Sequence, residues 1–205
     1  MQAGQGPGNE PVDEPGRAPD RTRRLTARDL ALVAVFAALI VVLGMPGALF
    51  AGSPVPITLQ TLGVMLAAAL LGWKRAALVM LTVIALVAVG LPVLAGGRGG
   101  LGVFAGPTVG YLLGWVPGSI VTGYLVERAR RLTPLVLFGA ILLGGVVVIH
   151  ACGIPGMMWR AHLDLPAALV ADAVYLPGDL VKAVLATVVA LGVHRASPDL
   201  LPRRA

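Results

Sequence analysis

Residues 30–73 read LALVAVFAALIVVLGMPGALFAGSPVPITLQTLGVMLAAALLGW, and none of them is charged. A helix that crosses a membrane needs about 20 mainly apolar residues, because each residue adds ~1.5 Å across a hydrocarbon core of ~30 Å. The stretch is long enough for two such helices, and it is interrupted near Gly44–Gly47 and at Ser53–Pro56. It therefore predicts membrane-spanning helices at about 30–46 and 57–73.

The rest of the chain continues this pattern. Further apolar runs predict spans at about 76–94, 108–126, 134–152 and 167–193, which gives six in all. Of the 205 residues 57% are hydrophobic and 13% are charged, whereas a soluble domain has roughly 25% charged residues. This composition excludes a soluble globule, a disordered chain and a coiled coil, and it predicts an all-α integral membrane protein. The single cysteine, Cys152, excludes a disulfide framework and a cysteine-cluster metal site.

The positive charges follow the predicted spans. All but three of the 16 Lys and Arg residues lie before the first span, in alternate loops or after the last span; the exceptions are Arg98, Arg160 and Lys182. Because Lys and Arg collect on the cytoplasmic side, both termini are expected in the cytoplasm. We expect a disordered tail at 1–27, a six-helix transmembrane domain at 28–195 and a second tail at 196–205. The net charge of +6 then reflects topology rather than nucleic-acid binding.

The predicted sixth span carries a polar stripe. Asp172, Tyr175, Asp179 and Lys182 fall within about 80° of arc if this span is one helix. A charge in the bilayer costs about 2.5–3.5 kcal/mol. The stripe is either a buried Asp179–Lys182 ion pair that fixes packing or the wall of a ligand cavity. Pro177 favours the cavity, because irregular backbone at membrane depth is tolerated where it lines one.

Two pairs of polar residues raise a catalytic interpretation. Asp172 and Asp179 resemble the acid pair of an intramembrane aspartyl hydrolase, although that chemistry takes its carboxylates from two helices and both residues here are predicted on one. His150 and Cys152 point in different directions on a helix, so they do not form a nucleophile–base pair.

A glycine-rich segment, 95–100, surrounds Arg98 with four glycines on the predicted external side. Glycine allows close backbone approach, and the planar guanidinium suits a carboxylate. This predicts a lid that faces a substrate; the alternative is a flexible connector with a snorkelling arginine. In the first span Ala34 and Ala38 are four residues apart, a spacing that lets two helices approach closely in lipid.

Five motifs occur in order along the chain: VPITLQTLG at 55–63, GLPV at 90–93, GGRGG at 96–100, GPT with GYL at 106–112, and LPGDLVKA at 176–183. Together they resemble the BioY family, the biotin-binding S components (substrate-binding subunits) of energy-coupling factor (ECF) transporters. The resemblance covers about residues 28–193. It implies an S-component bundle of six helices in the cell membrane that captures extracellular biotin, is not an enzyme and needs no cofactor or metal.

The resemblance also assigns roles to residues. Arg98, Asp179 and Lys182 fall on ligand-binding positions, with Gln60 and Tyr175 as neighbours. Asp179 is expected to accept hydrogen bonds from the ureido N–H groups of biotin, and either Arg98 or Lys182 to pair with its carboxylate.

The implied partners are a T-type transmembrane coupling protein, docked at Ala34 and Ala38, and a pair of ABC-type ATPases. The loop Met45–Pro54 and the glycine-rich segment are expected to gate the site from outside. An S component for another small vitamin and a purely structural membrane subunit are the alternatives.

Overall fold

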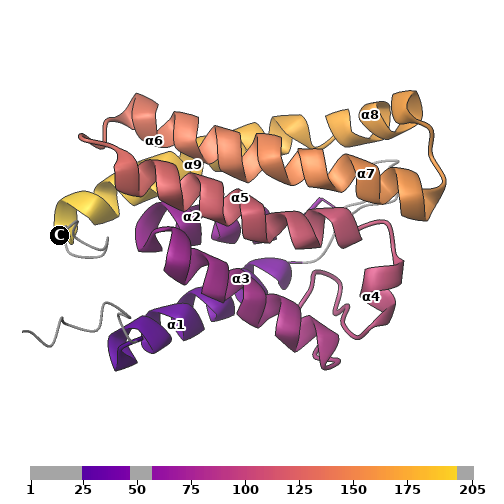
Figure 1. Cartoon of the computed structure of the whole chain (residues 1–205), viewed down its shortest axis with the longest axis horizontal. Coiled ribbons are helices and arrows are strands. Elements are labelled where there is room, and N and C mark those ends of the chain that lie inside the picture. Colours follow the sequence, from indigo (N-terminus) through magenta and orange to yellow (C-terminus); the bar gives the residue numbers. More distant parts are fainter. Residues whose placement is uncertain (1–24, 47–56, 198–205) are drawn as a thin grey trace, which may run out of the picture.

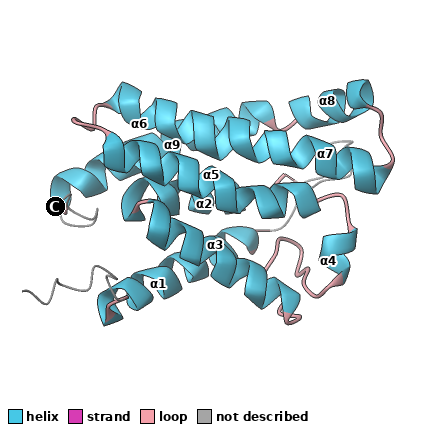
Figure 2. Cartoon of the chain, in the orientation of Figure 1, coloured by secondary structure: helices cyan, strands magenta, loops and turns pink. Residues whose placement is uncertain are grey.

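The computed structural model describes residues 25–46 and 57–197, and in them every regular element is a helix (Figures 1 and 2). In chain order they are α1 (Ala27–Gly44), α2 (Gln60–Leu71), α3 (Trp73–Ala88), α4 (Gly102–Ala105), α5 (Val109–Arg128), α6 (Pro134–Ile141), the π-helix η1 (Leu142–Val148), α7 (Ile149–Ala161), α8 (Leu165–Ala173) and α9 (Leu176–Ala196). The predicted all-α fold is therefore confirmed.

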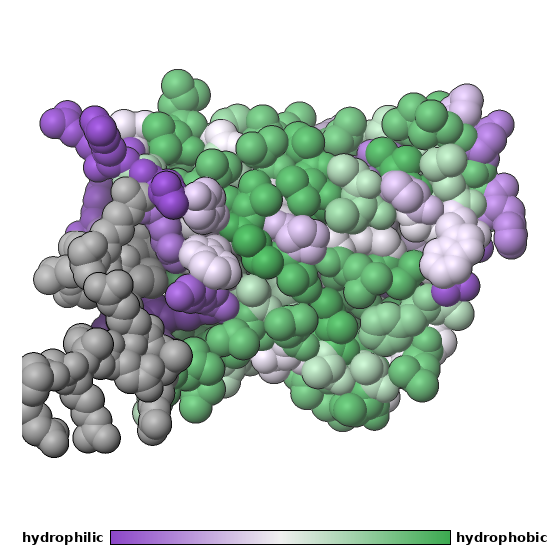
Figure 3. All heavy atoms as spheres, in the orientation of Figure 1, coloured by the Kyte–Doolittle hydropathy of each residue, from purple (hydrophilic) through white to green (hydrophobic). Residues whose placement is uncertain are grey.

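Within residues 25–46 and 57–197, four helices are long and apolar enough to cross a membrane: α1, α5, the continuous helix 134–161 formed by α6, η1 and α7, and α9. The molecular surface agrees, with an apolar band along the middle and hydrophilic residues towards the ends (Figure 3). The predicted second and third spans form the shorter helices α2 and α3, of 12 and 16 residues. Ten residues of α2 are buried, because it packs against α1, α3, α5 and α9 at the centre of the bundle.

Apart from Arg98, Arg160 and Lys182, the cationic residues of the described chain gather at one end of the bundle. The first turn of α1, the start of α3 and the last turns of α5 and α9 all lie there (Figure 1). Asp29 of α1 accepts a hydrogen bond of 2.6 Å from the Nε of Arg75 in α3, which ties these two helices together. The same carboxylate closes a capping box with Thr26, so the helix start and the ion pair support each other.

Glycine brings α5 into backbone contact with the helix formed by η1 and α7. A Cβ on Gly110 would lie 2.4 Å from the Cys152 carbonyl oxygen, and one on Gly144 would lie 2.4 Å from the Gly118 carbonyl oxygen. Helices in lipid approach this closely only where the side chain is missing. The seam therefore holds α5 directly beside the residues that follow the π-helix.

The predicted single helix at 167–193 is wrong, because the chain breaks between Ala173 and Leu176 into α8 and α9. Pro177 explains the break: its ring would clash with the carbonyl of Ala173, four residues earlier, but it fits the first turn of a new helix. The predicted fifth span is too short, since its helix continues to Ala161 and ends where His162 adopts a positive φ of 54°.

Candidate functional site

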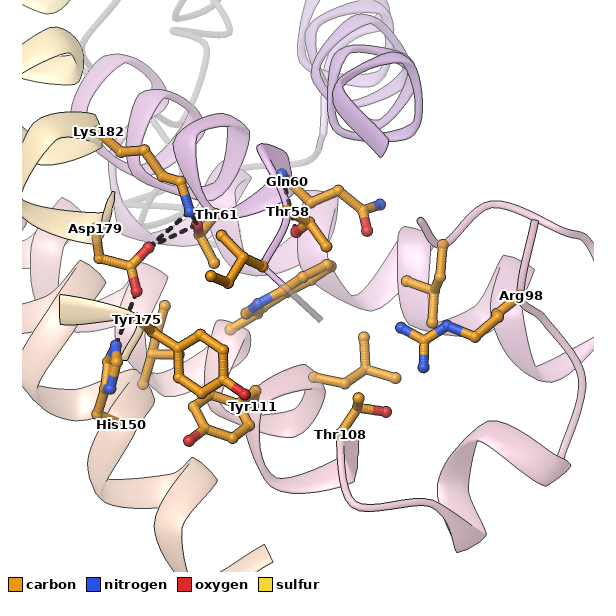
Figure 4. Close-up of a pocket in the computed structure, with 15 residues that line it drawn as sticks. Thr58, Gln60, Thr61, Arg98, Thr108, Tyr111, His150, Tyr175, Asp179 and Lys182 are labelled. Carbon is orange, nitrogen blue, oxygen red and sulfur yellow. Dashed lines mark hydrogen bonds and ion pairs between the residues drawn. The ribbon is translucent and has the colours of Figure 1, made fainter. Parts of the chain in front are cut away.

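A cavity lies between α2, α5, α7 and α9 and is closed at one side by the loop before α4 (Figure 4). The empty space in it is about 640 Å³, a figure that includes the open mouth. All five residues assigned to ligand binding line it: Gln60, Arg98, Tyr175, Asp179 and Lys182. Apolar side chains, among them Leu112, Trp115 and Ile149, form much of the remaining wall.

At one end of the cavity Asp179 and Lys182 form an ion pair. The Nζ of Lys182 lies 2.8 Å from Asp179 Oδ1 and also donates to the hydroxyl of Thr61 on α2, at 3.0 Å. The Thr61 hydroxyl in turn donates to Asp179 Oδ1, at 3.2 Å. Both charged residues are buried and both line the cavity. The two interpretations of the stripe are therefore compatible, because the ion pair is itself part of a cavity wall.

His150, which the sequence analysis did not assign to the site, is the centre of this cluster. Its Nε2 lies 3.0 Å from Asp179 Oδ2 and its Nδ1 lies 2.7 Å from Asp172 Oδ1. Tyr111 of α5 donates its hydroxyl proton to the same Asp172 oxygen. The signal was present in the sequence, because a histidine inside an apolar span is costly unless it has partners. Nearness along the chain suggests only Cys152 as a partner, whereas the partners in the structure come from α8 and α9.

Asp172 and Asp179 do not form a hydrolase pair. The expectation that both lie on one helix is wrong, since Asp172 belongs to α8 and Asp179 to α9. They bind opposite nitrogens of the His150 ring, which therefore stands between them. An aspartyl dyad needs two carboxylates close enough to share one proton, and this arrangement separates them.

Arg98 faces this cluster from the other side of the cavity (Figure 4). Its loop reverses through Gly96 and Gly97, with φ of 75° and 70°, and hydrogen bonds join the backbones of Leu94 and Arg98. In the described part of the chain Arg98 has no ion pair, and its one side-chain hydrogen bond runs from Nε to the Ala95 oxygen. Burial lowers the pKa of the Arg98 guanidinium, but arginine keeps its charge.

Gln60 lies at the cavity wall, but its amide binds backbone. Nε2 donates to the carbonyl oxygens of Ile40 and Val93, at 3.3 and 3.1 Å, and Oε1 accepts from the Ala95 N–H at 3.0 Å. Both amide hydrogens are therefore used in linking the end of α1 to the loop that carries Arg98. This geometry points to support of the loop rather than to direct donation to a ligand.

The remaining assigned positions differ in their surroundings. Tyr175 is buried at the junction of α8 and α9, with its ring edge-on to Tyr111 at a centroid distance of 5.9 Å. Ala34 and Ala38 are exposed on α1 and lie outside the cavity. Most of the expected gate loop Met45–Pro54 lies outside the described residues.

Comparisons with known proteins point to the same family as the five sequence motifs. A model of the BioY family matches residues 19–199. The biotin transporter BioY of Rhodobacter capsulatus is 50% identical over 189 residues, which cover 86% of this chain and 98% of the relative. That of Rhizobium etli is 46% identical over 188 residues, with coverages of 88% and 100%.

A solved structure gives the same result. The crystal structure of the S-component for biotin from an ECF-type ABC transporter superposes with a TM-score of 0.76 and 31% identity, over 82% of this chain and 91% of the other. The resemblance inferred from the five motifs is thus confirmed, and with it an S-component-like membrane bundle that belongs to transport and not to enzyme catalysis. This chain is a member of the BioY family.

Proposed function

We propose that this protein is the S component that captures extracellular biotin in its membrane-embedded cavity for ATP-driven uptake. The observation that carries the proposal is the contrast between the two sides of the cavity. Arg98 has a half-buried positive charge without an ion pair among the described residues, while the buried Asp179 and Lys182 neutralise each other. Such a cavity fits a ligand with one carboxylate and a neutral polar group, which describes biotin.

Hydrogen-bond counting supports the orientation of the ligand. A lysine ammonium has three donors and a carboxylate has about four acceptor positions. Lys182 uses two donors, and Asp179 accepts two bonds at Oδ1 and one at Oδ2. One donor and one acceptor are left, which match the carbonyl and one N–H of the ureido ring. In this orientation the valerate carboxylate pairs with Arg98, which is the alternative that the hydrogen-bond count favours over Lys182.

Binding and release follow from this arrangement. When the external loops close, water leaves the cavity and the charge-assisted hydrogen bonds to biotin strengthen. Release inside requires a state of the assembled transporter in which these contacts are weaker, because a ligand shifts an equilibrium only by its differential affinity. The partner subunits would drive that change with ATP.

The test is equilibrium binding of labelled biotin to the purified full-length chain, with biotin, dethiobiotin and unrelated vitamins as competitors. We expect biotin to compete best and Asp179→Asn to weaken binding. Equal competition by an unrelated vitamin would instead identify an S component with another substrate. No binding of any of these compounds would favour a structural subunit.

We further propose that α1 is the surface that docks on a T-type coupling protein, which works with ABC-type ATPases. The exposed Ala34 and Ala38 support this, because small side chains allow a partner helix to approach closely. The clustered cations support cytoplasmic termini in the cell membrane. Ala38→Trp should abolish uptake in cells with the partner subunits but leave biotin binding intact, whereas Val188→Trp on the exposed face of α9 should affect neither.

A further inference from the structure

Behind the proposed ligand contact at Asp179 lies a second buried carboxylate. Asp172 of α8 is connected to Asp179 of α9 through His150 of α7, and the side chains of His150 and Asp172 are only 8% and 7% exposed. Tyr111 of α5 donates to Asp172, and its ring meets the His150 ring edge-on at 5.7 Å. These contacts join four helices at one wall of the cavity, which Tyr111 and His150 themselves line.

The protons of this cluster can be counted. A neutral imidazole has one N–H donor and one acceptor nitrogen, and an ionised carboxylate only accepts. Both nitrogens of His150 face carboxylate oxygens. With a neutral ring and two ionised acids, one nitrogen lone pair would face an oxygen lone pair. With a doubly protonated ring, both contacts become hydrogen bonds.

Charge balance requires the same additional proton, which an imidazole binds more strongly than a carboxylate does. If His150 is an imidazolium, its charge and that of Lys182 cancel those of Asp172 and Asp179. If His150 is neutral and both acids are ionised, this buried group carries a net negative charge at membrane depth, which is unfavourable. Lys182 does not contribute a second partner for Asp172, because its ammonium group contacts Asp179 and Thr61.

We propose that Asp172 and His150 are positioning residues: Asp172 holds His150 as an imidazolium, and His150 fixes Asp179 so that one acceptor position on Oδ2 is directed to an N–H of the ligand. Lys182 and Thr61 occupy Oδ1, and His150 occupies the other position on Oδ2. The part that concerns the ligand rests on the proposed function, whereas the protonation state of His150 does not.

The first test needs no ligand. The full-length protein, labelled with ¹⁵N-histidine, contains His150, His162 and His194 in its described part, and loss of a signal in His150→Gln identifies His150. At neutral pH we expect both ring nitrogens of His150 to be protonated. In Asp172→Asn one nitrogen should lose its proton, because asparagine donates an N–H to it. A neutral His150 in the wild type, or an imidazolium that persists in Asp172→Asn, would overturn the proposal.

Asp164→Asn is the matched control. Asp164 is an exposed residue that caps α8 through a hydrogen bond to the Ala167 N–H, and asparagine caps a helix equally well. The same chemical change at this position should leave the His150 signals untouched. If it altered them, the effect of Asp172→Asn could not be ascribed to the His150 contact and the proposal would lose its support.

The second test measures ligand selection with biotin and its two derivatives methylated on one or the other ureido nitrogen. The wild type should reject one isomer, which has lost the N–H that meets Asp179. In Asp172→Asn the affinity for biotin should fall about tenfold, as expected for weakening a hydrogen bond to a charged group, while that for the rejected isomer should change little. His150→Gln should show the same two changes in affinity. The test can therefore still be made if Asp172→Asn does not fold.

The two proposals fail in different ways. If the wild type does not bind biotin, the proposed function is wrong, but the ¹⁵N result on His150 still stands or falls by itself. If the wild type binds biotin and both variants discriminate between the isomers as strongly as the wild type does, the proposed function survives and the positioning role is wrong.

Discussion

The two sides of the cavity are built on different principles. Around Asp179, each charged side chain already has a partner within the protein, and helices α2, α7 and α9 supply those partners. Around Arg98, the described structure provides only backbone: a tight glycine turn and the carbonyl of Ala95. On the proposed function, the first side (the paired side) is preorganised before any ligand arrives, whereas the second (the ligand-completed side) would be completed by the ligand. Substitutions should therefore affect protein stability on the first side and ligand affinity on the second.

The largest effect, on folding stability, is expected when the Asp179–Lys182 ion pair of the paired side is removed. Lys182→Met leaves Asp179 buried without its cation, and loss of one partner of a buried ion pair costs about 3–5 kcal/mol of folding stability. Thermal unfolding of the ligand-free protein in detergent should show this loss, together with loss of biotin binding. Lys74→Met, at an exposed cation beside Trp73, is the control and should unfold like the wild type. If both variants were equally stable, the paired side would not be a stabilising element.

The next largest effect, on ligand affinity, is expected at Arg98 on the ligand-completed side. Arg98→Gln should leave stability unchanged but lower the affinity for biotin about a hundredfold, because a desolvated charge pair with the ligand is lost. The affinity for biotin amide, which has no carboxylate, should not change. Isothermal titration with both ligands measures the difference, and Arg160→Gln, outside the cavity, is the control. An equal loss for biotin and its amide would show that Arg98 does not pair with the carboxylate.

The contrast between the two sides also explains which residues of the cavity can be predicted from the sequence. Arg98, Asp179 and Lys182, which line the cavity, stand out in the sequence because a charge in an apolar segment needs a reason. His150 was missed because its partners come from α8 and α9, and because a π-helix directly before it changes the register of the helix face. No local sequence pattern predicts that His150 contacts residues of these two helices. Pro177, in contrast, is a local signal for the break before α9. The sequence analysis interprets it as an irregularity within one helix, whereas in the structure it begins a second helix.

Gln60 connects the two sides, and its loss should have an intermediate effect. Gln60→Leu removes three hydrogen bonds that hold Val93, Ala95 and the end of α1 together. We expect biotin to bind about tenfold more weakly, since the Arg98 loop loses its support. Hydrogen exchange tests the cause: the Ala95 amide should exchange faster, whereas the Gly100 amide, bonded to the Val87 oxygen at 2.8 Å, should not. Unchanged exchange at Ala95 would contradict a supporting role.

The smallest effect should come from the glycine turn itself. Gly97 has a φ of 70°, and a Cβ placed on it would meet no atom within 4 Å. Gly97→Ala therefore creates no clash, and its cost is that of a left-handed backbone, about 1–2 kcal/mol. Part of that cost should appear as biotin binding weakened by up to about tenfold, measured by the same titration. Gly102→Ala is the matched control, because its surroundings are equally open and its φ is not positive. If the two variants bound biotin equally well, the shape of the turn would not be needed to place Arg98. The loop that carries Arg98 would then be flexible, in addition to leaving the Arg98 charge without an ion pair in the described structure.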